Sequence, residues 1–254
     1  RNQALKLAQG DYICFLDADD WYDRDALRQA VDVFSRHAHT DCVLFDVVQW
    51  LDDHHQQRIP LPQFEVMSGY EAFSESLSWA IHGVYMARRA LYDRYPYDDS
   101  CRAYSDDNTT RLHYYISREV RPCGGLYYYR QHEASVTHKA GLRHFDYLRA
   151  NASMRRQLID LGVGDDVLRR YENQRWLVLV DCWRFYFIHR QRMTPHDRRA
   201  ARAEMKRVWK TIDTTTLVPR NKWKLGYMPL RPAWRLFCLQ EELYFTLKRW
   251  LRRL

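Results

Sequence analysis

Hydrophobic and polar residues follow two different periods along the first half of the chain. The mostly apolar run from Tyr12 to Leu16 predicts a strand covered on both faces, and residues 42–50 predict a second core strand. Between them, four apolar positions have the i, i+3, i+4, i+7 spacing of an amphipathic helix: Leu27, Ala30, Val31 and Phe34. This succession of strand, helix and strand predicts a layered α/β domain.

Local signals add further elements. Residues 2–9, followed by Gly10, have the character of the last turns of a helix that ends at a glycine. Ser68 to Glu71 fits a capping box at the start of a short helix, and Ser105 is suited to cap a helix that runs to residue 116. Short strands are predicted at residues 83–86, 120–123 and 126–130.

From about residue 142 the pattern becomes helical. Helices are predicted over residues 142–161, 165–190 and 233–254, and a further helix starts at Thr194-Pro195. Gly162 is expected to end the first of them. We therefore expect an α/β domain over residues 1–139 and a helical extension over residues 140–254.

The net charge of +8 conceals an asymmetry between these two parts. Residues 1–139 carry 15 Lys and Arg against 21 Asp and Glu, whereas residues 140–254 carry 25 against 11. The asymmetry suggests chemistry in the first part and attachment to an anionic partner in the basic second part. A solvated helical surface explains the basic part equally well.

Composition excludes other classes of protein. Hydrophobic residues make up 46% of the chain and aromatic residues 15%, which argues against disorder. The longest apolar tract, residues 176–188, contains Asp181 and Arg184 and is shorter than the ~20 residues that span a bilayer. Six scattered cysteines without C-x-x-C spacing predict reduced thiols in a cytoplasmic protein.

Three carboxylates follow the first predicted strand: Asp17, Asp19 and Asp20. Crowded carboxylates repel one another, and a divalent cation that they share with substrate phosphates is one reason to gather them there. An Asp-rich turn before a helix would explain Asp20 but not a cluster that begins at the strand end. A phosphoaspartate hydrolase also has D-x-D after a strand, but the usual small hydroxyl residue is absent after Asp20.

Segments around this cluster resemble the middle of family 2 inverting glycosyltransferases of the GT-A fold. They are Arg1-Asn2-Gln3-Ala4-Leu5, Ala8-Gln9-Gly10-Asp11-Tyr12-Ile13 and Phe15-Leu16-Asp17-Ala18-Asp19-Asp20, with a looser likeness at Asp106-Asp107 and Tyr129-Arg130-Gln131-His132. The resemblance covers about residues 1–138. It implies a Rossmann-like domain that moves a hexose-type sugar, with inversion, from a nucleotide-diphosphate donor to a saccharide or lipid-linked acceptor in bacterial cell-envelope polysaccharide biosynthesis.

The resemblance also implies roles for individual residues. Asp17 corresponds to a position near the donor ribose and the metal, and Asp19 to the carboxylate that coordinates the metal at the diphosphate. Arg1 and Arg130 are expected to bind the donor, and His132 is expected at the metal or diphosphate. Bound Mg²⁺ or Mn²⁺ would neutralise charge on the departing nucleoside diphosphate. Lone Arg and His residues after a strand are more often loop residues, and a role at the site is expected less for His138 than for His132.

Asp107 corresponds to the general base of the family. An inverting transfer needs a carboxylate that takes the proton of the acceptor hydroxyl. This chain has Asp106 where the family usually has Glu, so the match is imperfect. The alternative is that both residues only stabilise the start of the helix.

Family members have a strand and loops that hold the nucleotide base and ribose ahead of the Arg-Asn helix. Nothing of that kind precedes Arg1 in this sequence. The sequence is therefore expected to be truncated at its N-terminus, to lack the first strands of the fold, and to bind nucleotide sugars poorly by itself.

The last predicted helix carries leucines and Trp250 on one side and basic residues mostly elsewhere. This arrangement fits attachment to an anionic membrane surface at the inner face of the cell membrane, or docking on the protein's own core. Two other functions stay open at this point: a metal-dependent phosphoryl or nucleotidyl transferase, and a non-catalytic module that binds membrane or nucleic acid. For the favoured glycosyltransferase, no nucleic-acid partner is expected.

Overall fold

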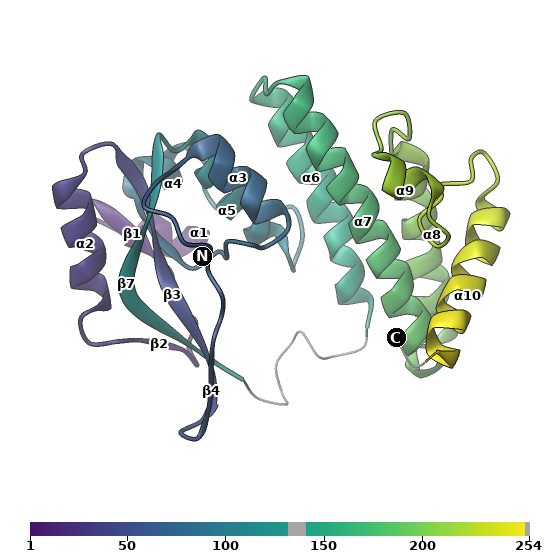
Figure 1. Cartoon of the computed structure of the whole chain (residues 1–254), viewed down its shortest axis with the longest axis horizontal. Helices are drawn as coiled ribbons and strands as arrows, with labels where there is room; N and C mark the ends of the chain where they lie inside the picture. The colour runs from purple at the N-terminus through teal and green to yellow at the C-terminus, as the bar shows by residue number, and fades with distance from the viewer. Residues whose placement is uncertain (132–140, 252–254) are drawn as a thin grey trace. The chain divides into compact units, whose positions relative to one another are not determined.

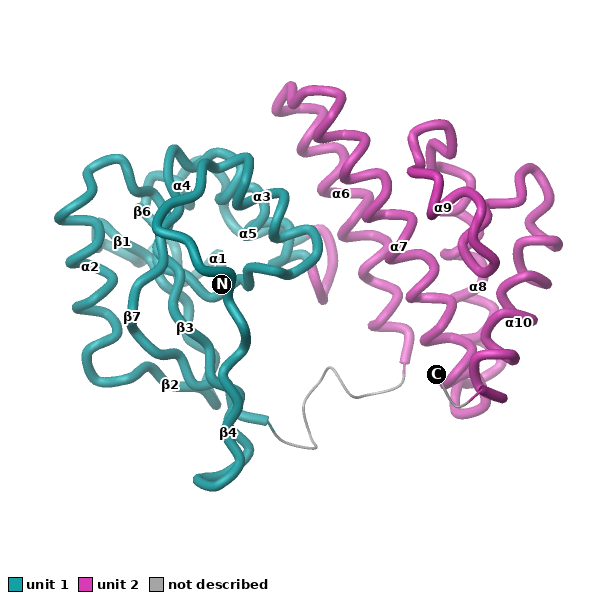
Figure 2. Tube along the Cα trace, viewed as in Figure 1, with its two compact units in different colours: residues 1–99, 105–138 teal, residues 100–104, 139–254 magenta. Residues whose placement is uncertain are grey.

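The computed structural model describes residues 1–131 and 141–251. The chain divides into two compact units: unit 1, residues 1–99 with 105–138, and unit 2, residues 100–104 with 139–254 (Figure 2). Each unit has a hydrophobic core of its own. The predicted site residues His132 and His138 lie outside the described residues.

Unit 1 is built on a seven-stranded mixed sheet (Figure 1). Its strands are β1 (Tyr12–Cys14), β2 (Trp21–Tyr22), β3 (Thr40–Asp52), β4 (His55–Arg58), β5 (Met67–Ser68), β6 (Tyr85–Arg88) and β7 (Glu119–Arg130). The order is β1-β6-β3-β7-β2, with β4 paired to β3 and β5 paired to β7. The pair β3 and β7 is parallel, and the other pairs are antiparallel.

Helices cover both faces of this sheet because β3 is apolar on both faces. Successive side chains of a strand point to opposite sides, so Val43 and Phe45 pack with α2 (Ala26–Arg36), whereas Cys42 and Leu44 face the opposite core. That second core includes residues of α3 (Gly69–Leu77), α4 (Arg89–Arg94) and α5 (Ser105–Ile116). The predicted layered α/β domain is thereby confirmed.

Two local predictions at the start of the chain are wrong. β1 was expected to be covered on both faces, but its three residues are only partly buried, and it stands at one end of the strand order. A strand in that position has one described neighbour, β6, and is paired to it antiparallel. Helix α1 (Asn2–Leu5) ends well before Gly10. Leu7, just after the helix, is 82% exposed and therefore has little contact with the core.

The segment around Gly124-Gly125 forms one continuous strand, β7, and not the two short strands expected. The glycines are explained by packing against α2. A Cβ atom on Gly125 would lie 2.7 Å from the Cα of Ala26, so the helix can approach the strand only where no side chain intervenes. The capping box of α3 is present as predicted, with bonds between Ser68 and Glu71 in both directions.

Unit 2 is helical. Its elements are η2 (Leu142–Phe145), α6 (Asp146–Asp160), α7 (Asp165–His189), η3 (Arg190–Arg192), α8 (Pro195–Thr211), α9 (Pro219–Trp223) and α10 (Trp234–Trp250). Gly162 adopts φ +70° just after α6, and the Thr194 side chain caps α8 as expected. Large aromatic residues fill the core: Trp176, Trp183, Trp209, Phe237 and Phe245. Over residues 1–131 and 141–251, no helix has the length and hydrophobicity needed to cross a membrane.

Candidate active site

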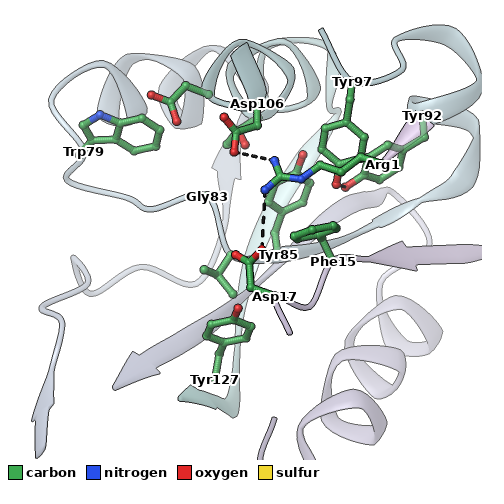
Figure 3. Close-up of a pocket in the computed structure, with 13 residues that line it drawn as sticks. Arg1, Phe15, Asp17, Trp79, Gly83, Tyr85, Tyr92, Tyr97, Asp106 and Tyr127 are labelled. Atoms are coloured by element: carbon green, nitrogen blue, oxygen red, sulfur yellow. Dashed lines mark hydrogen bonds and ion pairs between the residues drawn. The ribbon is translucent and has the colours of Figure 1, made fainter. Parts of the chain in front are cut away.

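A cavity of about 200 Å³ lies in unit 1, between the loop after β1, the first turn of α5 and the segment before β6 (Figure 3). It combines acidic, basic and aromatic side chains: Arg1, Asp17, Asp106 and Asp107 together with Phe15, Trp79, Tyr85, Tyr92, Tyr97 and Tyr127. Three of the residues singled out in the sequence, Asp17, Arg1 and Asp107, thus line one cavity.

Asp20 holds the loop after β1 in place. Its side chain is buried and accepts a hydrogen bond of 2.5 Å from the Tyr127 hydroxyl and one of 2.9 Å from the Arg130 backbone N–H. The Asp20 N–H in turn donates to the Asp17 carbonyl at 3.2 Å. Asp20 thus supports the loop, which leaves Asp17 half exposed at the cavity.

Replacement of Asp20 by Asn is expected to destabilise unit 1 by about 1–3 kcal/mol, because one buried oxygen acceptor is replaced by an amide N–H₂ that has no acceptor there. Thermal unfolding of the variant would show this as a lower Tm. The matched control is Asp32→Asn on the exposed face of α2, which should leave the Tm unchanged. Equal Tm values for both variants would contradict the anchoring role of Asp20.

Arg1 lies between two acidic segments of the cavity, as Figure 3 shows. Its Nη1 atom is 2.5 Å from Asp106 Oδ2, and its Nη2 atom is 3.9 Å from Asp17 Oδ1. The guanidinium also lies over the Phe15 ring, 4.1 Å from its centroid. Arg1 thus joins the loop after β1 to the first turn of α5 and places a positive charge at the centre of the cavity.

The sequence assigned Asp17 and Asp19 to a divalent cation; Asp17 lines the cavity, whereas Asp19 is exposed and lies outside the cavity lining. Burial raises the pKa of Asp17, the Arg1 guanidinium opposes the rise, and the neighbouring Asp20 and Asp19 add to it. A cation beside these residues would relieve their mutual repulsion. In the described part of the chain, no group of three or more His, Cys, Asp or Glu side chains is placed to hold a metal by itself. A cation held there would therefore need substrate phosphates and water to complete its shell.

Asp107 has the properties of a general base. Burial raises its pKa to about 7; nearby Asp106 adds to the rise, and Arg111 opposes it. Its Oδ2 atom is buried and has no hydrogen-bond partner in the described structure. A carboxylate with a pKa near neutrality and a free lone pair in a cavity can accept a proton at physiological pH.

Arg130 lies apart from the lining of this cavity. Its guanidinium is placed over the rings of Trp21 and Trp50, at 5.3 and 5.2 Å from their centroids, and its backbone N–H holds Asp20. The predicted donor contact of Arg130 therefore has no counterpart in the cavity lining, and His132 lies outside the described residues.

Trp79 is a cavity residue that the sequence did not reveal. It has φ +58°, an unusual conformation for a bulky residue, and its ring lies over the Arg111 guanidinium at 4.7 Å. Its ring lines the same cavity as Asp107. Neither a motif nor a periodicity marks such a residue, because the backbone of the loop alone brings it to the site.

Comparison with known proteins gives the class of this domain. The chain superposes on the crystal structure of S. aureus TarS residues 1–349, in complex with UDP-GlcNAc, with a TM-score of 0.68; the match covers 96% of this chain and 70% of that one, at 14% sequence identity. At this identity the likeness establishes the fold alone, which is of the GT-A type.

Sequence comparison matches part of the chain to a family. The model of glycosyl transferase family 2 matches residues 1–101. A stretch of 36 residues is 50% identical to the amylovoran biosynthesis glycosyltransferase AmsB of Erwinia amylovora; it spans 14% of this chain and only 12% of that relative. Residues 1–101 are thus similar to glycosyl transferase family 2, in agreement with the resemblance found in the sequence.

Proposed function

We propose that the protein transfers a sugar from a nucleotide-diphosphate donor to a saccharide or lipid-linked acceptor, with inversion at the sugar carbon. The observation that carries this proposal is the placement of Asp17, Arg1 and Asp107 around one cavity. Two acidic segments meet there; burial raises the pKa of Asp17 and raises that of Asp107 to about 7, which suits Asp107 to proton transfer.

In this proposal each charged residue of the cavity has a separate role. Asp107 takes the proton of the acceptor hydroxyl, which makes that oxygen a stronger nucleophile toward the sugar carbon. Arg1 provides positive charge near the donor phosphates and is held in position by Asp106 and the Phe15 ring. Asp17 and Asp19 would hold Mg²⁺ or Mn²⁺, which supplies Lewis-acid neutralisation of the departing nucleoside diphosphate.

The named relatives guide the choice of substrates. The structural neighbour binds UDP-GlcNAc, and the sequence relative is named for the biosynthesis of a polysaccharide, amylovoran. A UDP-hexose or UDP-N-acetylhexosamine donor and an acceptor of cell-envelope polysaccharide synthesis are therefore the first candidates.

A product assay on the full-length protein tests this function. The protein is incubated with Mn²⁺, a panel of nucleotide sugars and saccharide acceptors, and the phosphorus products are identified. Glycosyl transfer releases a nucleoside diphosphate. Release of inorganic phosphate or pyrophosphate would instead identify a phosphoryl or nucleotidyl transferase and would contradict the proposal.

The pH dependence of transfer follows from the pKa of Asp107. Because that pKa is raised to about 7, the carboxyl is protonated and inactive below this pH and becomes an ionised base above it. We expect kcat/KM to rise between about pH 6 and 8 with a midpoint near 7, at saturating metal. Donor affinity measured over the same range serves as the control. A flat profile would contradict the assignment of the base.

We further propose that α10 attaches the protein to an anionic membrane surface. Phe237 and Phe245 bury one face of the helix in the core of unit 2. The outward residues are large and apolar, each about half or more exposed: Leu236, Leu239, Leu243, Leu247, Trp250 and Leu251. The helix therefore docks on the core of unit 2 through its phenylalanine face, and the leucines lie on its exposed face.

Charge favours an anionic occupant of this leucine face. Partial burial lowers the pKa of Lys224, and nearby Arg220 and Lys248 lower it further, so cations gather beside α10. Basic residues beside an apolar helix face attract anionic lipid with roughly 1 kcal/mol each.

Co-sedimentation with vesicles tests the attachment. The full-length protein should bind phosphatidylglycerol vesicles, and Leu239→Gln with Leu243→Gln should reduce binding about tenfold or more. The control is Leu177→Gln, an exposed leucine of α7. Normal vesicle binding by the double variant would show that α10 is not the membrane contact. The same conclusion would follow if light scattering showed the wild type to be a dimer and the double variant to be a monomer.

A further inference from the structure

A second cluster of charged residues lies in unit 2, where α6, α7 and α8 surround a hollow of about 650 Å³. Its charged lining consists of Arg149, Arg155, Arg156, Arg175, Arg207 and Glu204. A neighbouring hollow of about 440 Å³ shares Arg149 and Glu204 with it and adds Arg102, Arg143 and one carboxylate, Asp146. We call the two adjoining hollows the arginine groove.

The protein's own carboxylates only partly neutralise the larger hollow. Glu204 accepts hydrogen bonds of 2.9 and 2.7 Å from Arg207, and these bonds lower its pKa, so it is ionised at neutral pH. Buried Glu172 accepts from Arg155 at 3.3 Å and from Arg175 at 2.7 Å. Two carboxylates thus face five guanidinium groups, which leaves three positive charges.

Arg175 distinguishes this hollow from an ordinary solvated surface. Its side chain is only 3% exposed, although arginine is rarely buried without a reason. The Nη1 and Nη2 atoms donate to Glu172 and to Thr211 Oγ1, but the Nε atom is buried and has no partner in the described residues. A buried charged donor without an acceptor is costly, so an acceptor from outside the protein would stabilise this arrangement.

The chemistry of the lining indicates which acceptor fits. Guanidinium groups bind phosphate through paired N–H donors and stay charged at every physiological pH. The two adjoining hollows carry separate arginines, which suits more than one phosphate group. Apolar lining by Phe145, Ala152 and Ala201 leaves room for the part of a ligand that joins or carries the phosphates.

We propose that the arginine groove binds a ligand carrying two or more phosphate groups. This site lies within unit 2 and is independent of the transferase cavity in unit 1, so its test does not depend on the outcome of the transfer assay. The phosphates can belong to a soluble diphosphate or to the head groups of a lipid surface, and the experiment separates these sources.

Calorimetric titration of the full-length protein with pyrophosphate tests the proposal. The buffer contains EDTA, so that no metal-dependent diphosphate site is occupied. Saturable binding is expected, and Arg156→Gln with Arg207→Gln should weaken it at least tenfold. The charge-matched control is Arg169→Gln with Lys210→Gln, two exposed residues outside the groove. Arg175→Lys, which keeps the positive charge but lacks the paired N–H donors of the guanidinium group, should also weaken binding.

Parallel titrations with inorganic phosphate and with phosphatidylglycerol vesicles identify the source. Pyrophosphate binding stronger than phosphate binding supports a soluble diphosphate ligand. Vesicle binding that is lost in the Arg156/Arg207 variant, without pyrophosphate binding, supports lipid phosphates. Equal weakening in the groove variant and the charge-matched control would attribute the effect to net charge and overturn the proposal. Absence of pyrophosphate and phosphate binding, with vesicle binding that is absent or that the Arg156/Arg207 variant retains, would also overturn it.

Discussion

Replacement of Asp107 by Asn is expected to lower kcat for sugar transfer by about 10²–10⁴-fold, the usual contribution of a positioned general base. Asn keeps the size of the side chain but cannot accept a proton. Donor affinity should survive, because Asp17, Asp19 and Arg1 are unchanged. Steady-state kinetics on the full-length protein, with donor binding measured separately, would check both parts.

The same variant should not lose stability, which separates a catalytic role from a structural one. The folded-state pKa of Asp107 is raised to about 7, so ionisation is unfavourable in the folded protein, and this cost grows as pH rises from about 4 to 7. At pH 8, Asp107→Asn should therefore be at least as stable as the wild type, by thermal unfolding. At pH 4 the variant and the wild type should be equally stable.

Asp93→Asn on α4 is the matched control for this experiment, because its carboxylate is 70% exposed and lies outside the cavity lining. It should change neither kcat nor Tm. If Asp107→Asn transferred sugar at the normal rate, Asp107 would not be the base. A loss of activity that matched a loss of folded protein would assign the residue a structural role.

Replacement of Asp19 by Ala should have the second large effect. Loss of one of two carboxylates at a divalent cation is expected to lower kcat/KM by about 10²-fold or more and to raise the Mn²⁺ concentration needed for half-maximal activity. Activity measured against Mn²⁺ concentration and Mn²⁺ binding followed by electron paramagnetic resonance would check it. Asp19 is exposed, so the fold should persist.

Asp32→Asn on α2 is the control for this measurement, because it removes an exposed carboxylate that lies outside the cavity lining. It should leave metal dependence unchanged. Normal transfer by Asp19→Ala at low Mn²⁺ would show that Asp19 is not a metal ligand. A binding module without catalysis would show no sugar transfer in any of these proteins.

The amount of structure that the sequence predicted depends on how local each signal is. The capping box at Ser68 and the glycine after α6 were predicted correctly because their hydrogen bonds involve neighbouring residues. The position of β1 at the end of the sheet was not predicted, since apolar composition does not say how many neighbours a strand has. Strand order is decided by pairings between segments far apart in the chain.

The candidate site shows the same limit. Asp17, Asp107 and Arg1 were found because a family resemblance marks them, and the structure brings them together around one cavity. Trp79 and the aromatic lining were missed, since only the fold brings these residues to the cavity. The arginine groove was also missed: the sequence revealed the excess of basic residues beyond residue 140, but not that five arginines from three helices meet.

A crystal of the full-length protein grown with Mn²⁺ and a nucleoside diphosphate tests the central claim most directly. Anomalous scattering from manganese locates the ion without any assumption about the reaction. The account predicts a manganese peak bonded to the Asp17 and Asp19 carboxylates and to the diphosphate, in the cavity that Asp107 lines. A bound diphosphate with manganese elsewhere, or with Asp17 and Asp19 free of metal, would contradict it.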